Sequence, residues 1–323
     1  MDWGLKNRMA KIIKPTDGRA VMLAVDHGYF LGPTEKLEVP KKTIQPLLKY
    51  CDSLMITRGV LRTSVNANND VPVVLRVSGG SSIIGEDLSN EEITTSVKDA
   101  IRLNVTVLAM SVFVGSKYEH KTIVNLGRLV NEAEEYGIPV LAVTAVGKEL
   151  GKDARYLSLA CRVAAEQGAH IVKTYYCKDF EKVVESCPVP IIIAGGKKTS
   201  EREALELTYN AIKAGAVGVD MGRNIWQSDN PVPMIKAVRA IVHGNLNVNQ
   251  AYDMYKKLCN EQSKTKKNTK PNKQKNNQNK PKQKNNQNKN KPNNPNNQNK
   301  SKNQNKPKQK NNQNKNKPNK QKK

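Results

Sequence analysis

The chain has 323 residues and a formal net charge of +25, but its positive charge is concentrated at the C-terminal end. Residues 263–323 contain 21 Lys and no Asp or Glu, so subtracting these lysines from +25 leaves +4 for residues 1–262. The body of the chain is therefore nearly ordinary in charge. Its size, about 260 residues, is typical of one large α/β domain with a substantial core.

Composition also excludes several classes of protein. The five cysteines are odd in number and include no Cys-x-x-Cys pair, which argues against a disulfide framework and favours reduced thiols in a cytoplasmic protein. The first residues lack the apolar run of a signal peptide, and no stretch approaches the ~20 apolar residues of a membrane span. The histidines have no spacing typical of a metal site, so we expect no metal. We expect no tightly bound cofactor either.

Eight apolar, β-branched runs of strand length follow one another along the body. They are Val21–Gly28, Ser53–Gly59, Pro72–Gly79, Val105–Ser111, Pro139–Gly147 and the runs around Lys173, Ile192 and Val219. All eight are almost continuously apolar rather than alternating. This pattern is typical of parallel strands that are buried on both faces.

Helical patterns fill most of the intervals between these runs. We expect helices over Asn90–Leu103, Glu119–Tyr136, Asp153–Gln167, Ser200–Ala214 and Pro231–Val242. The fourth opens with a capping box of Ser200 and Glu203, and several end at a glycine. Eight strand-then-helix units in a body of this size favour a closed (β/α)8 TIM barrel. An open doubly wound sheet is the alternative.

The segment from Ser263 to the C-terminus is built from Lys, Asn, Gln and Pro with almost nothing else. A 13-residue string at 281–293 recurs at 307–319, and the segment contains no apolar residue. We therefore divide the chain into a barrel domain, 1–262, and a disordered basic tail, 263–323. The tail could contact nucleic acid non-specifically through phosphates, but a repeat-expanded extension without a specific role is favoured.

Lys173 is the strongest candidate for chemistry. It lies in the apolar run 169–176, and a lysine amine in such surroundings can lose its charge and attack a carbonyl. The structural alternative is an ion pair with a barrel acid such as Asp26 or Asp220. In a TIM barrel the C-terminal ends of the strands carry the active site, and Asp26 and His27 end the first strand. They could serve as acid and base, although His27 could equally be an ordinary turn residue.

Two glycine-bearing strand ends follow Lys173. Gly195-Gly196 comes after the seventh strand and Gly222-Arg223 after the eighth, which is the recurring phosphate position of this barrel. Plain tight turns are the alternative explanation. Two further cations, Arg58 and Lys197, are predicted to lie near the same substrate.

These residues, in this order, resemble the DhnA-type class I aldolases, the archaeal fructose-bisphosphate aldolase family. The resemblance covers about residues 2–258. It rests on stretches such as Val21–Phe30, Thr57–Arg62, Val172–Tyr176, Ala194–Lys198 and Gly218–Ile225. It is closest to a thiolase branch that processes phosphorylated autoinducer-2. This branch resemblance implies cleavage of 3-hydroxy-5-phosphonooxypentane-2,4-dione with coenzyme A to acetyl-CoA and dihydroxyacetone phosphate.

The resemblance also implies roles for individual residues and a quaternary structure. Lys173 would form the Schiff base, Asp26 would lie near the iminium, and the two glycine sites would hold the phosphate. The family often forms a ten-subunit ring, so a homo-oligomer is expected. The aldolases carry a tyrosine after the fifth strand, whereas this chain has Val143–Lys148 without one. That difference favours the thiolase branch over ordinary fructose-bisphosphate cleavage.

Two alternatives remain at this point. One is a class I fructose-bisphosphate aldolase or a related sugar-phosphate aldol enzyme that needs no coenzyme A. The other belongs to a different class: a nucleic-acid-binding protein in which the barrel is a scaffold and the tail binds. Because the Schiff-base lysine does not depend on the tail, we rank the second alternative last.

Overall fold

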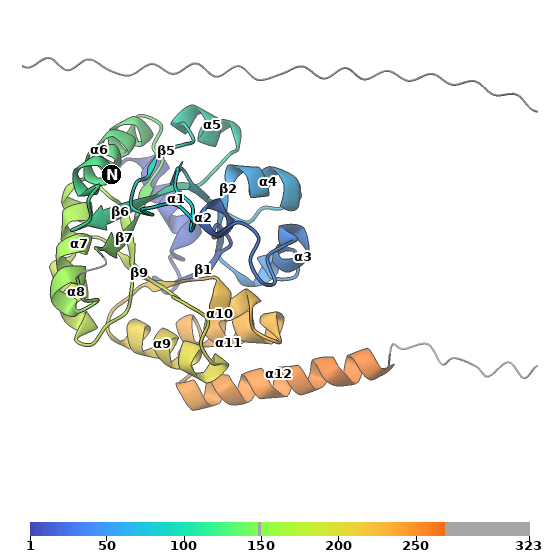
Figure 1. The fold of residues 1–323 in the computed structure, drawn as a ribbon. Coiled ribbons are helices and arrows are strands. Elements are labelled where there is room, and N and C mark those ends of the chain that lie inside the picture. The colour runs from blue at the N-terminus through green and yellow to red at the C-terminus, as the bar shows by residue number, and fades with distance from the viewer. Residues whose placement is uncertain (148–149, 269–323) are drawn as a thin grey trace, which may run out of the picture. The chain divides into compact units, whose positions relative to one another are not determined.

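The computed structural model describes residues 1–147 and 150–268 and shows a closed barrel of eight parallel strands ringed by helices (Figure 1). Neighbouring strands pair in the order β1, β10, β9, β8, β7, β6, β3, β2. The barrel strands are β1 (Ala20–Ala24), β2 (Ser53–Thr57), β3 (Val73–Arg76), β6 (Val107–Val114), β7 (Val140–Val146), β8 (Ile171–Thr174), β9 (Ile191–Ala194) and β10 (Gly218–Met221). Each corresponds to one of the eight predicted runs, so the predicted TIM barrel is confirmed.

Two hydrophobic clusters follow from the alternation of side chains along each strand. In β1, Val21 and Leu23 point outward into the layer between barrel and helices, whereas Ala20, Met22 and Ala24 fill the barrel interior. All five residues are buried, which explains why the strands read as continuous apolar runs. The interior is therefore a packed core, and a cavity can form only at one of its ends.

Helix α1 (Trp3–Ile12) closes the end of the barrel at which the strands begin. Ile12 is fully buried and belongs to the interior cluster together with Ala20 and Ile171, the first residues of β1 and β8. Asp2 caps the start of this helix, because its carboxylate accepts a hydrogen bond from the backbone N–H of Leu5. Because this end is plugged, the opposite end, where the strands finish, is left for the site.

The remaining helices cover the outside of the barrel or follow individual strands. They are α2 (Gly28–Leu31), α3 (Pro40–Ile44), the 3-10 helix η1 (Leu48–Tyr50), α4 (Arg58–Ser64), α5 (Val97–Arg102), α6 (Glu119–Glu134), α7 (Ala154–Glu166), α8 (Phe180–Ser186), α9 (Glu201–Lys213), α10 (Arg223–Trp226), α11 (Pro231–Val242) and α12 (Val248–Asn268). The predicted capping box is present at the start of α9, where Ser200 and Glu203 exchange hydrogen bonds. Gly137 and Gly168, just after α6 and α7, have the positive φ angles that such helix ends require.

The helix predicted over 90–103 is wrong in its first half. Residues Glu92–Ile93 form strand β5, which pairs antiparallel with β4 (Ser78–Gly79), and α5 begins only after Ser96, which caps it. The β-branched Thr94 and Thr95 are poor helix formers, and their backbone N–H groups bond to Val77 O. The cross-strand pairing therefore replaces the first turns of the expected helix.

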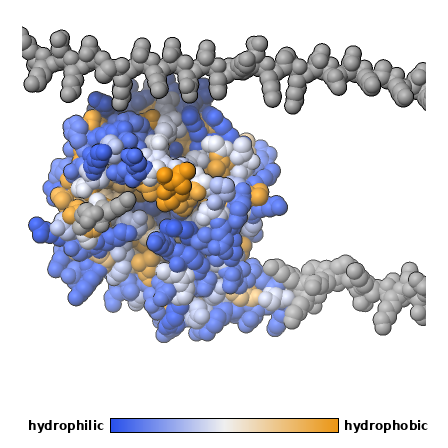
Figure 2. Space-filling view, in the orientation of Figure 1, coloured by the Kyte–Doolittle hydropathy of each residue, from blue (hydrophilic) through white to orange (hydrophobic). Residues whose placement is uncertain are grey.

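At the C-terminal side, α12 continues to Asn268, past the expected start of the tail at Ser263. The rest of the predicted tail lies outside the described residues and its disorder stays a prediction. In the part of the chain that is described, no helix is long and apolar enough to cross a membrane. The surface in Figure 2 is mostly hydrophilic, and its most prominent hydrophobic patch lies near the centre of the face shown.

Candidate active site

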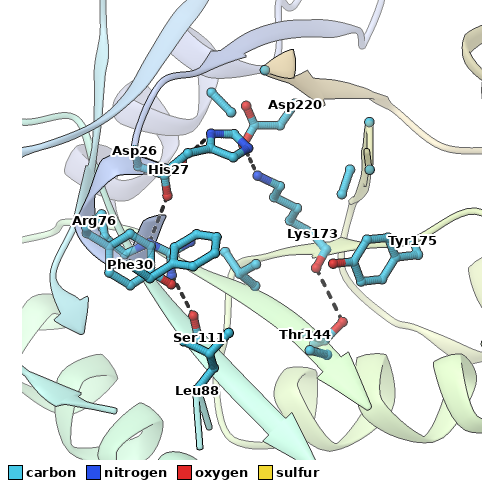
Figure 3. A pocket seen from close by; sticks show the side chains of 18 of the residues that line it. Asp26, His27, Phe30, Arg76, Leu88, Ser111, Thr144, Lys173, Tyr175 and Asp220 are labelled. Atoms are coloured by element: carbon cyan, nitrogen blue, oxygen red, sulfur yellow. Dashed lines mark hydrogen bonds and ion pairs between the residues drawn. The ribbon is translucent and has the colours of Figure 1, made fainter. Parts of the chain in front are cut away.

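A cavity of about 250 Å³ opens at the C-terminal ends of the strands, where the barrel interior meets the following loops (Figure 3). Seven of the nine predicted site residues line it: Asp26, His27, Lys173, Gly195, Gly196, Gly222 and Arg223. The other lining residues are Ala24, Tyr29, Phe30, Arg76, Leu88, Glu91, Ser111, Phe113, Val143, Thr144, Ala145, Tyr175, Ala194 and Asp220. Segments that are distant in sequence thus meet at one end of the barrel.

Lys173 extends from β8 into this cavity and is only 7% exposed. Its Nζ lies 2.7 Å from Asp220 Oδ2 on β10 and 3.5 Å from Met55 Sδ on β2. Burial raises the pKa of Asp220, and the neighbouring Lys173 opposes that rise. Asp220 Oδ1 is buried without a hydrogen-bond partner among the described residues. The ion pair weighed as a structural alternative therefore exists, yet the amine also faces the cavity, where a carbonyl could reach it.

A chain of polar contacts joins Asp26 to two other strands. Asp26 Oδ2 accepts a hydrogen bond of 3.0 Å from Arg76 Nε, and Arg76 Nη1 donates to Ser111 Oγ at 2.8 Å. Burial alone would raise the pKa of Asp26, but the charges of Arg76 and Lys173 outweigh it and hold that pKa below the usual value. Asp26 is therefore a fixed negative charge rather than a group that readily takes up a proton.

His27 lies beside this chain, at the start of α2. Its Nδ1 is 3.8 Å from Asp26 Oδ1, too far for a hydrogen bond, and has no other partner among the described residues. The ring meets Trp226 edge-on, with the centroids 5.6 Å apart. Burial lowers the pKa of His27 to about 4, so the imidazole is neutral at pH 7. It can donate or accept a hydrogen bond but adds no positive charge.

The two glycine sites lie next to one another at the ends of β9 and β10. Asn224 Nδ2 donates to Gly195 O at 2.7 Å and so ties the two loops together. A Cβ atom at Gly222 would lie 2.5 Å from His27 Cε1 and 2.6 Å from Ala24 O, so no side chain fits there. Gly196 has φ +72°, a conformation that favours glycine. These turns place Gly196, Gly222 and Arg223 on the cavity wall, where backbone N–H groups and a guanidinium can bind an anion.

The structure places the other two predicted residues outside the cavity. Arg58 is the first residue of α4 and reaches away to α5, where its Nη1 bonds to Asp99 Oδ2 at 2.8 Å. Lys197 is exposed in the loop after β9. Its neighbour Lys198 forms an ion pair with Glu201 and does not line the cavity either. Neither residue lines the cavity, so the contact of Arg58 and Lys197 with the substrate stays a prediction. The ion pair with Asp99 of α5 and the exposure of Lys197 direct the two side chains elsewhere.

Sequence reasoning missed several lining residues altogether. Glu91 is buried, and its two carboxylate oxygens accept hydrogen bonds from Tyr29 OH at 2.8 Å and Ser78 Oγ at 2.6 Å. Ser111 and Tyr175 also face the cavity. Ser111 and Tyr175 lie on or just after predicted strands, so the strand-end rule could have singled them out. Glu91 carried no such signal because its segment was assigned to a helix.

No group of three or more His, Cys, Asp or Glu that could hold a metal ion occurs within residues 1–147 and 150–268. The groups available in the cavity are an amine, carboxylates, hydroxyls, a neutral imidazole, two guanidiniums and backbone N–H donors. Such a set can form an imine with a ketone, hold an anion and transfer protons.

Comparisons with known proteins agree with this chemistry. The DeoC/LacD family aldolase domain matches residues 20–228. The 3-hydroxy-5-phosphonooxypentane-2,4-dione thiolase of Klebsiella pneumoniae is 56% identical over 256 residues, which cover 79% of this chain and 86% of that protein. The thiolase of the same name from Escherichia coli K12 is 54% identical, and an uncharacterised aldolase of Pasteurella multocida is 55% identical; each match covers 79% of this chain and 88% of the relative.

Solved structures that resemble this chain also include aldolases. An archaeal fructose 1,6-bisphosphate aldolase superimposes with a TM-score of 0.68 at 26% identity, over 74% of this chain and 99% of that one. An archaeal aldolase with its catalytic lysine covalently bound to the carbinolamine intermediate of the substrate gives 0.67 at 25% identity, over the same shares. The expected resemblance to class I aldolases is confirmed. The chain belongs to the DeoC/LacD family of aldolases.

Proposed function

We propose that the protein is a Schiff-base thiolase that cleaves 3-hydroxy-5-phosphonooxypentane-2,4-dione with coenzyme A, giving acetyl-CoA and dihydroxyacetone phosphate. The observation that carries the proposal is the buried amine of Lys173, held 2.7 Å from Asp220 Oδ2 and open to the cavity. Relatives that are 54–56% identical carry the name of this thiolase. The proposal also places the protein in the cytoplasm as a homo-oligomer.

The phosphate of the substrate would bind at the ends of β9 and β10. The N–H groups at Gly196 and at the start of α10 and the guanidinium of Arg223 supply donors for an anion there. Arg223 Nε is buried and has no partner among the described residues, as expected for a donor that binds a ligand. The neutral His27 beside Gly222 supplies another polar contact.

Lys173 would attack the C4 carbonyl, the carbonyl next to the phosphate-bearing carbon. The neutral amine forms a carbinolamine, which loses water to give a protonated imine. Asp220, in contact with Nζ and with a raised pKa, is placed to exchange protons with the amine and with the departing hydroxyl. The fixed negative charge of Asp26 then stabilises the positive iminium in this buried site.

The iminium makes the next step possible because it accepts electrons. The thiolate of coenzyme A attacks C2, and the bond between C2 and C3 breaks. The bonding pair moves into the enamine on Lys173, so that C2 leaves as the acetyl thioester. Protonation at C3 and hydrolysis of the imine release dihydroxyacetone phosphate and the free lysine.

The wall of the cavity at the end of β7 fits a thiolase. It consists of Val143, Thr144 and Ala145, without the tyrosine that class I aldolases carry after this strand. The likeness to archaeal aldolase structures nevertheless keeps one second candidate, cleavage of fructose 1,6-bisphosphate. Binding of nucleic acid through the basic tail has no support in the described residues.

A coupled assay of the full chain tests the proposal. Purified protein is incubated with the phosphorylated dione with and without coenzyme A, beside a parallel incubation with fructose 1,6-bisphosphate. Acetyl-CoA formation that requires the dione supports the thiolase. Cleavage of fructose 1,6-bisphosphate without acetyl-CoA would instead identify an aldolase.

A further inference from the structure

Glu91 is a buried carboxylate in the cavity to which none of the steps above assigns a role. It is 4% exposed and ends the loop that follows β4, directly before β5. Tyr29 OH and Ser78 Oγ donate to its two oxygens, and Ser78 Oγ in turn accepts from the backbone N–H of Ser111 at 3.0 Å. These hydrogen bonds fix the position of the Glu91 carboxylate inside the cavity.

The order of the strands shows where Glu91 lies relative to the phosphate site. In a closed barrel of eight strands, β9 stands opposite β3, and β10 stands opposite β6. The phosphate site is at the ends of β9 and β10, whereas Glu91 is bonded to Ser78, which follows β3 and contacts β6 through Ser111. In Figure 3, Asp220 of β10 and Ser111 of β6 lie on opposite sides of the cavity.

The substrate would therefore cross the cavity from one wall to the other. With its phosphate at β9 and β10 and C4 on Lys173 of β8, its C3 and C2 point toward the wall that holds Glu91. The thiol that attacks C2 must approach the same wall. Leu88 and Phe113 on this wall offer apolar contact for the acetyl methyl group.

The two other carboxylates and the imidazole in the cavity differ from Glu91, which among the described residues accepts hydrogen bonds only from two neutral hydroxyls. Asp26 is locked to Arg76 at 3.0 Å. Asp220 is bonded to Lys173, and His27 lies against Gly222 on the phosphate side. Glu91 is thus the carboxylate that lines the far wall without an ionic partner in the described part of the chain.

We propose that Glu91 is the catalytic residue that takes the proton from the acceptor thiol and returns it to C3. This inference rests on the proposed thiolase function. The S–H bond breaks and its proton passes to the Glu91 carboxylate, while the sulfur forms a bond to C2. After the C2–C3 bond has broken, the same proton moves from Glu91 to C3 of the enamine. One carboxylate thereby serves both steps, and it ends the cycle in the ionised form in which it began. Tyr29 is a positioning residue, since its hydroxyl orients Glu91.

Glu91→Gln tests this role, with Glu86→Gln as the matched control. Glu86 is exposed on the same loop and does not line the cavity. Glutamine keeps the shape and can still accept a hydrogen bond, but it cannot carry the proton. We expect acetyl-CoA formation to fall by about 10²–10⁴-fold in Glu91→Gln and to stay unchanged in Glu86→Gln.

Two further readouts separate proton transfer from a structural role. Glu91→Gln should still form the imine, seen as a borohydride-reduced adduct of wild-type yield with dihydroxyacetone phosphate. The wild-type protein should exchange the hydroxymethyl protons of dihydroxyacetone phosphate with D2O through the enamine, as followed by proton NMR. Glu91→Gln should lose this exchange.

Exchange at the wild-type rate in Glu91→Gln would overturn the assignment. So would a variant that forms no imine, because Glu91 would then support Lys173 instead of carrying the proton. Wild-type protein that forms the imine and exchanges the protons but makes no acetyl-CoA would refute the thiolase proposal and confine Glu91 to the protonation at C3. Failure of the proposed function is therefore distinguishable from failure of this inference.

Discussion

Each end of the barrel holds a cluster of polar and charged side chains around a buried aspartate, and the clusters differ in how completely these side chains are paired. At the end where the strands begin, Asp52 accepts hydrogen bonds from Arg239, from His243 and from the backbone N–H of Val21. At the other end, Asp220, His27 and Arg223 each keep a buried polar atom without a partner among the described residues. A cluster that is fully paired stabilises the fold, whereas one with open positions is arranged for a ligand.

The largest expected effect at the open end follows from Lys173→Ala. Removing the amine abolishes imine formation, so activity should fall on the order of 10⁴-fold or more. Borohydride trapping and the acetyl-CoA assay measure this. Lys178→Ala, which changes an exposed lysine just after β8, is the control and should leave both readouts unchanged. Residual trapping in Lys173→Ala would show that another amine is the nucleophile.

At the end where the strands begin, a substitution should lower the stability of the protein rather than its activity. Asp52→Ala leaves a buried N–H, Arg239 and His243 without their shared acceptor, so the free energy of unfolding should fall by about 3 kcal/mol. Chemical denaturation measures this loss, and the specific activity of the folded fraction should be retained. Asp253→Ala, at a carboxylate that is 72% exposed, should change stability by less than about 1 kcal/mol. Equal losses in the two variants would remove the contrast between the two ends.

A smaller effect is expected at Gly222. A Cβ there would lie 2.6 Å from Ala24 O, so Gly222→Ala must shift the backbone that leads into α10. We expect a strain of about 1–3 kcal/mol, expressed mainly as weaker binding of the phosphorylated substrate. Steady-state kinetics should show KM rising more than kcat falls. An unchanged KM would mean that the phosphate binds elsewhere.

The smallest effect is the pH dependence contributed by His243. Hydrogen bonds to Asp52 and Asp17 raise its pKa in the folded protein, against the opposing effect of burial. Because the folded-state pKa lies above the unfolded one, this stabilisation is fully present below about pH 6.5 and is lost as the pH rises through the raised pKa. Thermal unfolding of wild type and His243→Gln from pH 5 to 9 should show a stability gap that narrows at alkaline pH. A gap that widens would contradict the assigned protonation.

Much of the fold was predictable because its signals are local. The eight strands are continuous apolar runs, and the capping box at Ser200 and Glu203 marks the start of α9 without reference to the rest of the chain. Lys173 was found because a charged residue inside a buried strand is costly unless it has a function or a partner. Its partner, Asp220, was named only as one of two possibilities, since pairing depends on which strands meet.

The differences at Glu91 and Arg58 share one cause, contacts between segments far apart in sequence. Glu91 was overlooked because the segment after Ser89 carries helix-start signals, and only the pairing with β4 turns it into a strand. Arg58 was assigned to the substrate because it follows a strand, yet Asp99 draws it to α5. Local patterns indicate which residues reach the end of the barrel, but not which of them turn into the cavity.

The measurement that tests the central claim most directly is borohydride reduction of the full-length protein with dihydroxyacetone phosphate, followed by intact-mass analysis and peptide mapping. The open cluster around Lys173 predicts one reduced adduct per chain, located at Lys173 and absent from Lys173→Ala. An adduct at another lysine, or none at saturating ligand, would contradict the account of this cavity as a Schiff-base site.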